Sequence, residues 1–251
     1  MPTSRQHDTR FFVYIVESPS APDLYHGRFE GSLVAQALKL NRIPCVARIA
    51  ISRDAFYAAL IHGVSDAMKA LPGHLPVLHF SAHGSTDGLQ LSNGEFIAWE
   101  ELRNLLMPIN CSLPLGVLVC MSTCNGFHAC QMAMTLEQAP HPFFATVGST
   151  GTPSWSDTAV SYFTFYHLFA KGFTIRDAVD RMNVASGEGS WVVQTADDAK
   201  QSYLDFCRNA DADEVRQSLD RAAEHAELPP DVKTLGAMVP AEAENGDRSS
   251  D

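Results

Sequence analysis

Short runs of β-branched and aromatic residues alternate along this chain with longer segments of helical period. FFVYIVES (residues 11–18) and CVARIAI (45–51) are the first two runs, and between them Leu33, Ala37 and Leu40 recur at helical spacing. Such an alternation is typical of strand–helix–strand units, in which parallel strands form a sheet and helices pack on its faces. It predicts an α/β fold.

The same pattern continues as far as residue 195. Four further strands are predicted at 76–82, 115–122, 142–148 and 191–195, the last as an edge strand, which gives a mostly parallel sheet of about six strands. Before the second of these, DGLQLSNGEFIAW contains the turn sequence SNG and predicts a hairpin. Helices are predicted from Ser52 to Ala70, over EELRNLL, and over 128–138, 157–170 and 174–185.

Composition and charge exclude several classes of protein. The chain has 251 residues, 45% hydrophobic and 19% charged, as expected for a soluble globular protein. Its 18 basic and 29 acidic side chains give a net charge of −11, which argues against nucleic acid as a partner. Residues 197–251 hold 14 of the acidic and 6 of the basic side chains. We expect a folded domain over 1–196, an acidic helical extension over 197–227 and a mobile tail over 228–251.

The cysteines and the apolar runs bear on where the protein works. Six cysteines are present, and the N-terminal sequence MPTSRQHDTRFF lacks the apolar core of a secretory signal peptide. No apolar run reaches the roughly 20 residues that a membrane-spanning helix needs. We therefore expect a cytoplasmic protein with reduced thiols and no membrane segment.

Two chemically reactive residues follow predicted strands directly. The strand PVLHFSA ends in His83–Gly84, and the strand LGVLVCMS ends in Thr123–Cys124–Asn125–Gly126. In an open parallel sheet the ligand crevice lies beyond the carboxyl ends of the strands. A thiol of ordinary pKa is mostly protonated at neutral pH, and an imidazole beside it takes its proton or stabilises the thiolate. His83 and Cys124 are therefore predicted to form a base and a nucleophile.

Both residues are also predicted to lie at turns where backbone amides are free. Gly84 allows the main chain to approach a substrate carbonyl, so the N–H groups of Gly84 and Cys124 are candidates for an oxyanion hole. Acyl transfer, most simply hydrolysis of a peptide bond, is the predicted reaction. It requires no cofactor and no metal.

The two motifs resemble those of a known family. HFSAHG followed by VLVCMSTCNG is similar to the caspase-like cysteine peptidases, and within them to the CHAT group, which is related to separases. The likeness covers roughly residues 11–195 and includes the hairpin region and SWSDTAVSYFTFYHLFAKGFTIRDAV. It implies a caspase–haemoglobinase-like three-layer sandwich, His83 as base, Cys124 as nucleophile, and residues 1–196 as the peptidase domain.

The resemblance leaves the cleavage preference open. The chain has S-T-C-N-G where animal caspases have Q-A-C-[RQG]-G, so specificity for aspartate is not implied. Asp157, behind Trp155, stands where separase-like relatives place an acid that selects Arg or Lys, and we favour it over Arg28, which would select an acidic side chain. The expected partners are a protein substrate and an activating protein acting in trans.

Other interpretations apply to several of these residues. Asp157 can equally cap the helix that follows it. Cys120 is expected in the core. The spacing of Cys120, Cys124, His128 and Cys130 disfavours a zinc site.

Two alternatives to a peptidase also remain. One is a catalytically silent caspase-like interaction module. The other is a thiol-dependent transferase or amidase, because chemistry at an acyl centre does not fix the leaving group.

Overall fold

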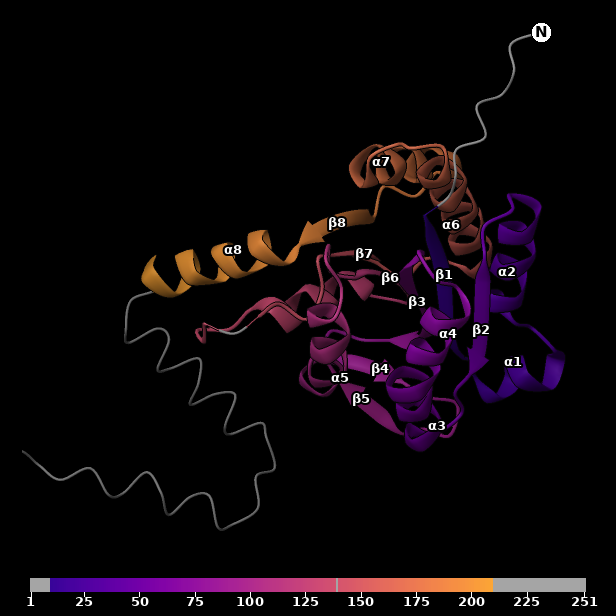
Figure 1. Ribbon diagram of the computed structural model, residues 1–251, viewed down its shortest axis with the longest axis horizontal. Helices are drawn as coiled ribbons and strands as arrows, with labels where there is room; N and C mark the ends of the chain where they lie inside the picture. Colours follow the sequence, from indigo (N-terminus) through magenta and orange to yellow (C-terminus); the bar gives the residue numbers. More distant parts are fainter. Residues whose placement is uncertain (1–9, 139, 210–251) are drawn as a thin grey trace, which may run out of the picture. The chain divides into compact units, whose positions relative to one another are not determined.

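The computed structural model describes residues 10–138 and 140–209 of the chain (Figure 1). The strands of this part are β1 Phe11–Ser18, β2 Cys45–Ile49, β3 Leu75–Gly84, β4 Gly88–Gln90, β5 Phe96–Ala98, β6 Leu118–Ser122, β7 Ala145–Ser149 and β8 Trp191–Thr195. Its helices are α1 Ala21–His26, α2 Glu30–Leu40, α3 Arg53–Ala58, the π-helix η1 Ala59–Gly63, α4 Val64–Ala70, α5 Trp99–Cys111, the 3₁₀-helix η2 Gly126–Ala133, α6 Trp155–Ala170, α7 Ile175–Ser186 and α8 Ala196–Asn209.

The central sheet has six strands in the order β2-β1-β3-β6-β7-β8. All neighbouring pairs are parallel except β7 and the edge strand β8. The hairpin β4–β5 pairs with the end of β3 and lies off this path. The predicted α/β fold with a mostly parallel sheet of about six strands is confirmed, and so are the hairpin and the edge strand.

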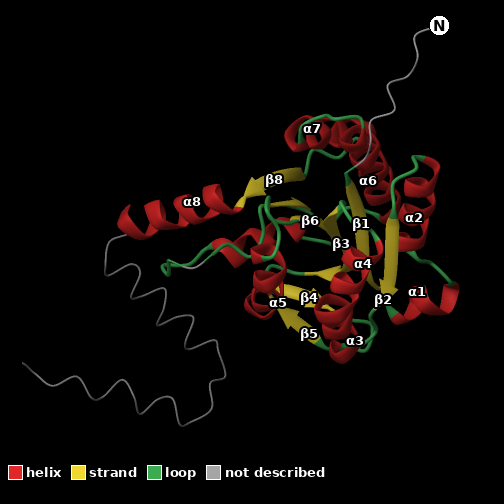
Figure 2. Ribbon diagram, in the orientation of Figure 1, coloured by secondary structure: helices red, strands yellow, loops and turns green. Residues whose placement is uncertain are grey.

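Helices cover both faces of this sheet (Figures 1 and 2). Side chains alternate along each strand, so that in β1 Phe12 and Tyr14 pack with α3, α4 and α5, whereas Val13 and Ile15 pack with α2, α6 and α7. Both sets are buried, which is why the strands are near-continuous apolar runs. The predicted three-layer architecture is confirmed.

Three helical details differ from the prediction. Residues 21–26, for which no helix is predicted, form the short helix α1, because Ser20 Oγ accepts a hydrogen bond from Asp23 N and caps the first turn. The segment predicted as a helix over 128–138 is the 3₁₀-helix η2 and ends at Ala133. In α2 the buried apolar residues are Val34 and Leu38, so the stripe predicted from Leu33 and Leu40 is displaced by one position.

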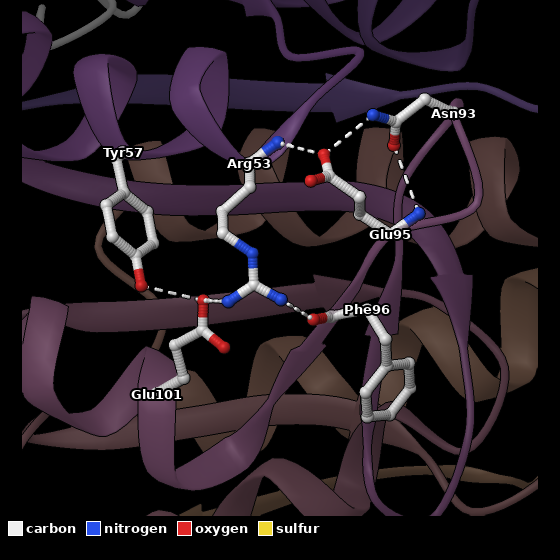
Figure 3. A network of polar contacts seen from close by, with 6 residues as sticks. All are labelled: Arg53, Tyr57, Asn93, Glu95, Phe96 and Glu101. Carbon is white, nitrogen blue, oxygen red and sulfur yellow. Dashed lines mark hydrogen bonds and ion pairs between the residues drawn. The ribbon is translucent and has the colours of Figure 1, made fainter.

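A polar network centred on Arg53 holds the hairpin against α3 and α5 (Figure 3). The Arg53 guanidinium donates to Glu101 Oε1 at 2.5 Å and to the carbonyl of Phe96 at 2.7 Å, and Tyr57 donates to the same Glu101 oxygen at 2.7 Å. Arg53 N donates to Glu95 at the hairpin turn. Because this hairpin begins just beyond His83, the network fixes the chain on one side of that residue.

The chain divides into a compact unit that ends at Leu204 and a second unit from Asp205 onward. The described part of the second unit is residues 205–209, the last turn of α8. The rest of the predicted acidic extension and the predicted tail over 228–251 lie outside the described residues. Across residues 10–138 and 140–209, no helix combines the length and the apolar character needed to cross a membrane.

Candidate active site

His83 and Cys124 lie at matching positions on neighbouring strands. β3 and β6 are parallel and adjacent, with Ser81 opposite Ser122 in the register. His83 and Cys124 each come two residues later, His83 as the penultimate residue of β3 and Cys124 just beyond the end of β6, and both line one cleft. His83 is exposed and Cys124 is partly buried. The structure therefore brings the predicted base and the predicted nucleophile to the same place.

The turn that carries Cys124 has an unusual backbone. Asn125 adopts a left-handed conformation, with φ 54° and ψ 24°, which asparagine tolerates better than most residues. Its N–H donates to the carbonyl of Gly151 at 2.7 Å and so ties the turn to the loop after β7. Gly148 in β7 packs directly beneath, because a Cβ there would lie 2.5 Å from the carbonyl carbon of Gly126. The chain at Cys124 is thus held from two sides.

At Gly84, the backbone that follows His83 packs directly against the backbone of Cys124. A Cβ on Gly84 would lie 2.2 Å from the carbonyl oxygen of Cys124, so this contact requires glycine. Ser85 N donates a hydrogen bond to Gly88 O. Hydrogen-bonded and non-hydrogen-bonded pairs alternate along an antiparallel ladder, so the next pair, Gly84 and Leu89, is not hydrogen-bonded. The Gly84 N–H accordingly points away from β4.

Cys124 has a free amide of its own. Within the described part of the chain, its N–H meets no hydrogen-bond acceptor. Free N–H donors are what an oxyanion hole needs. The pairing of the Gly84 and Cys124 amides in such a hole stays a prediction.

The cleft is small, and both strand ends and helices form its walls. Its volume is about 80 Å³. Its walls come from the ends of β1, β3 and β6, from the first residue of α2, and from the start of α6, which supplies Trp155 and Thr158.

A buried carboxyl group, Glu30, lines this cleft below the reactive pair. The residue is only 2% exposed. Ser81 Oγ donates to its Oε2 at 2.5 Å, and Ser122 Oγ donates to its Oε1. Burial raises the pKa of Glu30 to about 7, against the two serine hydrogen bonds, which lower it. One carboxyl group thereby joins the two strands that carry His83 and Cys124.

Helix α2 is placed by a second buried acid. Glu17, near the end of β1, accepts a hydrogen bond from the N–H of Gly31 at 2.9 Å. The contact holds the first turn of α2 over the sheet and sets the position of Glu30. Burial raises the pKa of Glu17 as well.

Sequence reasoning missed Glu30, although a signal for it exists. Ser81 and Ser122 each stand two residues before a predicted reactive residue, inside runs that are otherwise apolar. Two hydroxyls on one buried face require a polar partner. That partner comes from α2, far away in the sequence, and no local pattern points to it.

The residues predicted to set specificity are not all in the cleft. Trp155 lines it, but Asp157 does not. Asp157 N donates to Ser154 Oγ at 3.3 Å, and Ser154 Oγ donates to Asp157 Oδ2 at 2.5 Å, as in a capped helix start. Arg28 is exposed, pairs with Asp23 at 3.3 Å, and lines a neighbouring groove that also contains Trp155.

The other cysteines are unsuited to nucleophilic chemistry or lie elsewhere. Cys120 is in the core, as predicted, and burial raises its pKa to about 12. Burial likewise raises the pKa of Cys130 to about 11. Over the described ranges, 10–138 and 140–209, no three His, Cys, Asp or Glu side chains gather as metal ligands would.

A larger hollow on the opposite face of the sheet carries no such chemistry. It has a volume of about 660 Å³ and lies between η1, α4 and α5. Apolar side chains such as Leu60, Met68 and Ile109 form most of its wall, and Lys69 is its one charged residue. Size alone would favour this hollow, but the reactive groups are in the smaller cleft.

Comparisons with known proteins give distant structural similarity only. The crystal structure of the Arg-specific cysteine proteinase gingipain R (RGPB) is 13% identical with a TM-score of 0.46, over 77% of this chain and 48% of that one. A complex of the Porphyromonas gingivalis RgpB pro- and mature domains is 13% identical with a TM-score of 0.43, over the same shares. The chain thus spans about half the length of these proteins. No protein-family model matches it, and comparison with curated proteins gave no significant match.

Proposed function

We propose that this protein is a cysteine endopeptidase of the caspase-like type, with His83 as the base and Cys124 as the nucleophile. The observation that carries the proposal is the register of β3 and β6, which brings the two residues to equivalent strand ends beside one cleft. No described side chain bonds to the His83 ring, so the proposed centre is a dyad. Catalytic hydrogen bonds often tighten only when substrate binds.

The proposed reaction proceeds through an acyl-enzyme. His83 takes the proton of the Cys124 thiol, and the sulfur attacks the scissile carbonyl carbon. The carbonyl oxygen becomes an oxyanion that accepts hydrogen bonds from the N–H groups of Gly84 and Cys124. As the tetrahedral intermediate collapses, the C–N bond breaks and His83 gives its proton to the leaving amine. A water molecule, deprotonated by His83, then hydrolyses the thioester and restores the thiol.

The proposed cleavage follows a basic residue. Glu30 lines the cleft, so a Lys or Arg side chain bound there would meet its carboxyl group. We assign selection to Glu30 and not to Asp157, since Asp157 contacts the cap of its own helix. The protein substrate and an activating partner in trans stay part of the proposal.

The experiment that tests the nucleophile uses peptide ketone probes. Chloromethyl or acyloxymethyl ketones ending in Arg, Lys or Asp are incubated with the protein, and the adduct is located by intact mass and peptide mapping. Labelling of Cys124 is expected in the unaltered protein, and its rate should fall on His83→Ala. Cys124→Ala should abolish the adduct, whereas Cys111→Ala, which removes an exposed cysteine outside the cleft, serves as the matched control.

Failure of this labelling would favour the silent interaction module. If Cys124 reacts no faster than the exposed Cys111, with and without added cell lysate, the peptidase proposal is wrong. Lysate that restores selective labelling would indicate the activating partner.

A second experiment compares the three candidates for specificity. The ratio of kcat/KM for basic over neutral peptides is measured in Glu30→Gln, Asp157→Asn and Arg28→Ala. This ratio cancels effects on the dyad that both substrates share. We expect Glu30→Gln to lower it most; a fall confined to Asp157→Asn would return the role to that residue, and a preference for acidic peptides that Arg28→Ala removes would assign it to Arg28.

A further inference from the structure

A second hollow adjoins the cleft and is not used by the proposed chemistry. This groove, of about 440 Å³, lies between the first turns of α2 and α6 and is closed at one end by the α1–α2 turn. Its wall is mainly apolar and is formed by Phe29, Leu33, Trp155 and Ala159, with Arg28 and Gln36 among its polar members.

The apolar side chains of the groove are only partly covered. Leu33 is 52% exposed and Trp155 is 44% exposed. Both come from helices that also supply core residues, Val34 in α2 and Tyr162 in α6. Apolar residues that are uncovered and concave, and that lie beside a reactive site, are typical of a surface that binds a ligand.

The groove adjoins the cleft. Glu30 and Trp155 line both hollows, so one layer of side chains separates them. An extended peptide advances about 3.3 Å per residue. A peptide with one residue in the cleft therefore brings a residue one or two positions away to the groove.

The charges at the groove also suit a peptide. Apart from Glu30, which is buried between the two hollows, Arg28 is the one charged residue of its wall. The ion pair with Asp23 at 3.3 Å holds the Arg28 side chain at the rim, where its remaining N–H groups can donate to a peptide carbonyl. The apolar wall of the groove then contacts the side chain of the bound peptide residue.

We propose that this groove is a second substrate subsite, which binds a large aliphatic or aromatic side chain near the residue held in the cleft. The proposal rests on the proposed peptidase function, because the peptide must pass over Cys124. It goes further in assigning Leu33, Trp155 and Ala159 to substrate recognition and in naming the chemistry recognised.

The test separates the groove from the catalytic dyad. Quenched fluorescent peptides share the residue for the cleft and carry Phe, Leu, Ala or Asp at each neighbouring position. The ratio of kcat/KM for Phe over Ala is measured in the unaltered protein, in Leu33→Lys and in Val184→Lys. Val184 is an 83% exposed aliphatic residue on α7 outside both hollows, and is the matched control. Binding of the same peptides to Cys124→Ala, followed by fluorescence anisotropy, gives a readout that needs no catalysis.

The expected result is a preference for Phe or Leu of roughly tenfold or more at one position, lost in Leu33→Lys and kept in Val184→Lys. The anisotropy series should show the same order of affinities. Absence of any preference, or a preference that Leu33→Lys leaves intact, overturns the proposal. So does a dimer that Leu33→Lys dissociates, since the groove would then be an interface between copies. If the protein binds the peptides with this preference but never cleaves them, the peptidase function alone is refuted.

Discussion

The buried carboxyl group of Glu30 makes a quantitative prediction about stability. Burial raises its pKa in the folded protein to about 7, from an ordinary value of 4.5. The folded state therefore binds this proton more tightly than the unfolded state does. Its contribution to stability is fully present below pH 4.5 and is lost as the pH rises through 7, by about 3 kcal/mol in total.

The substitution Glu30→Gln removes this titration and keeps the shape of the side chain. The amide oxygen can accept from one of the two serines, and the amide nitrogen can donate to the other. The free energy of unfolding of the variant, minus that of the unaltered protein, should rise by about 3 kcal/mol between pH 4 and pH 8.

Urea unfolding at a series of pH values measures this difference, provided that both proteins unfold in two states with equal slopes. Glu100→Gln, at an exposed position on α5, measures what a Glu-to-Gln change does outside the cleft. Parallel pH curves for Glu30→Gln and the unaltered protein would refute the assignment of a raised pKa to Glu30.

Three further predictions follow from the site and its support. Gly84→Ala should lower the rate of Cys124 alkylation by about a hundredfold, because its Cβ would displace the thiol-bearing backbone; an unchanged rate would contradict the close contact. Burial lowers the pKa of His79 to about 3, so stability should fall as the pH drops below 6.5, and His79→Leu should flatten that acid limb in urea unfolding; an equally steep limb would show that other groups cause it. Ser154→Ala should cost about 1 kcal/mol by removing the cap of α6, measured by urea unfolding against Ser156→Ala.

The sheet could be predicted from the sequence because its strands are buried on both faces and form unbroken apolar runs. Helix α2 was harder. It carries Leu33 and Leu40 on one side and Val34 and Leu38 on the other, and local spacing cannot decide which pair faces the sheet. The strand beneath the helix determines which pair is buried, because Glu17 accepts a hydrogen bond from the N–H of Gly31 and so fixes the rotation of the helix.

The shared location of His83 and Cys124 was predictable for a reason that does not extend to their neighbours. Each lies at the carboxyl end of a central strand, so the topology alone places both at one edge of the sheet. Asp157 lies in the first turn of α6 and Arg28 in the turn before α2, where a charged residue either reaches the cleft or satisfies local groups. Asp157 bonds to its own helix cap and Arg28 pairs with Asp23, and such choices depend on contacts that no spacing encodes.

Beneath the dyad the sheet carries a column of polar residues. The sequence H-F-S-A-H in β3 and C-M-S-T-C at the end of β6 have the same period of two, and His79 lies opposite Cys120 as Ser81 lies opposite Ser122. All of these positions belong to the face that α2 and α6 cover.

Polar groups in a core cost stability unless they are paired, and this column pairs most of them, although His79 Nε2 has no hydrogen-bond partner among the described residues. The serines bond to Glu30, and His79 Nδ1 lies 2.9 Å from the hydroxyl oxygen of Tyr166. Apolar side chains at the same positions would stabilise the strands without needing hydrogen-bond partners. The column therefore carries polar groups from the core to the end of the sheet, where His83 and Cys124 line the cleft.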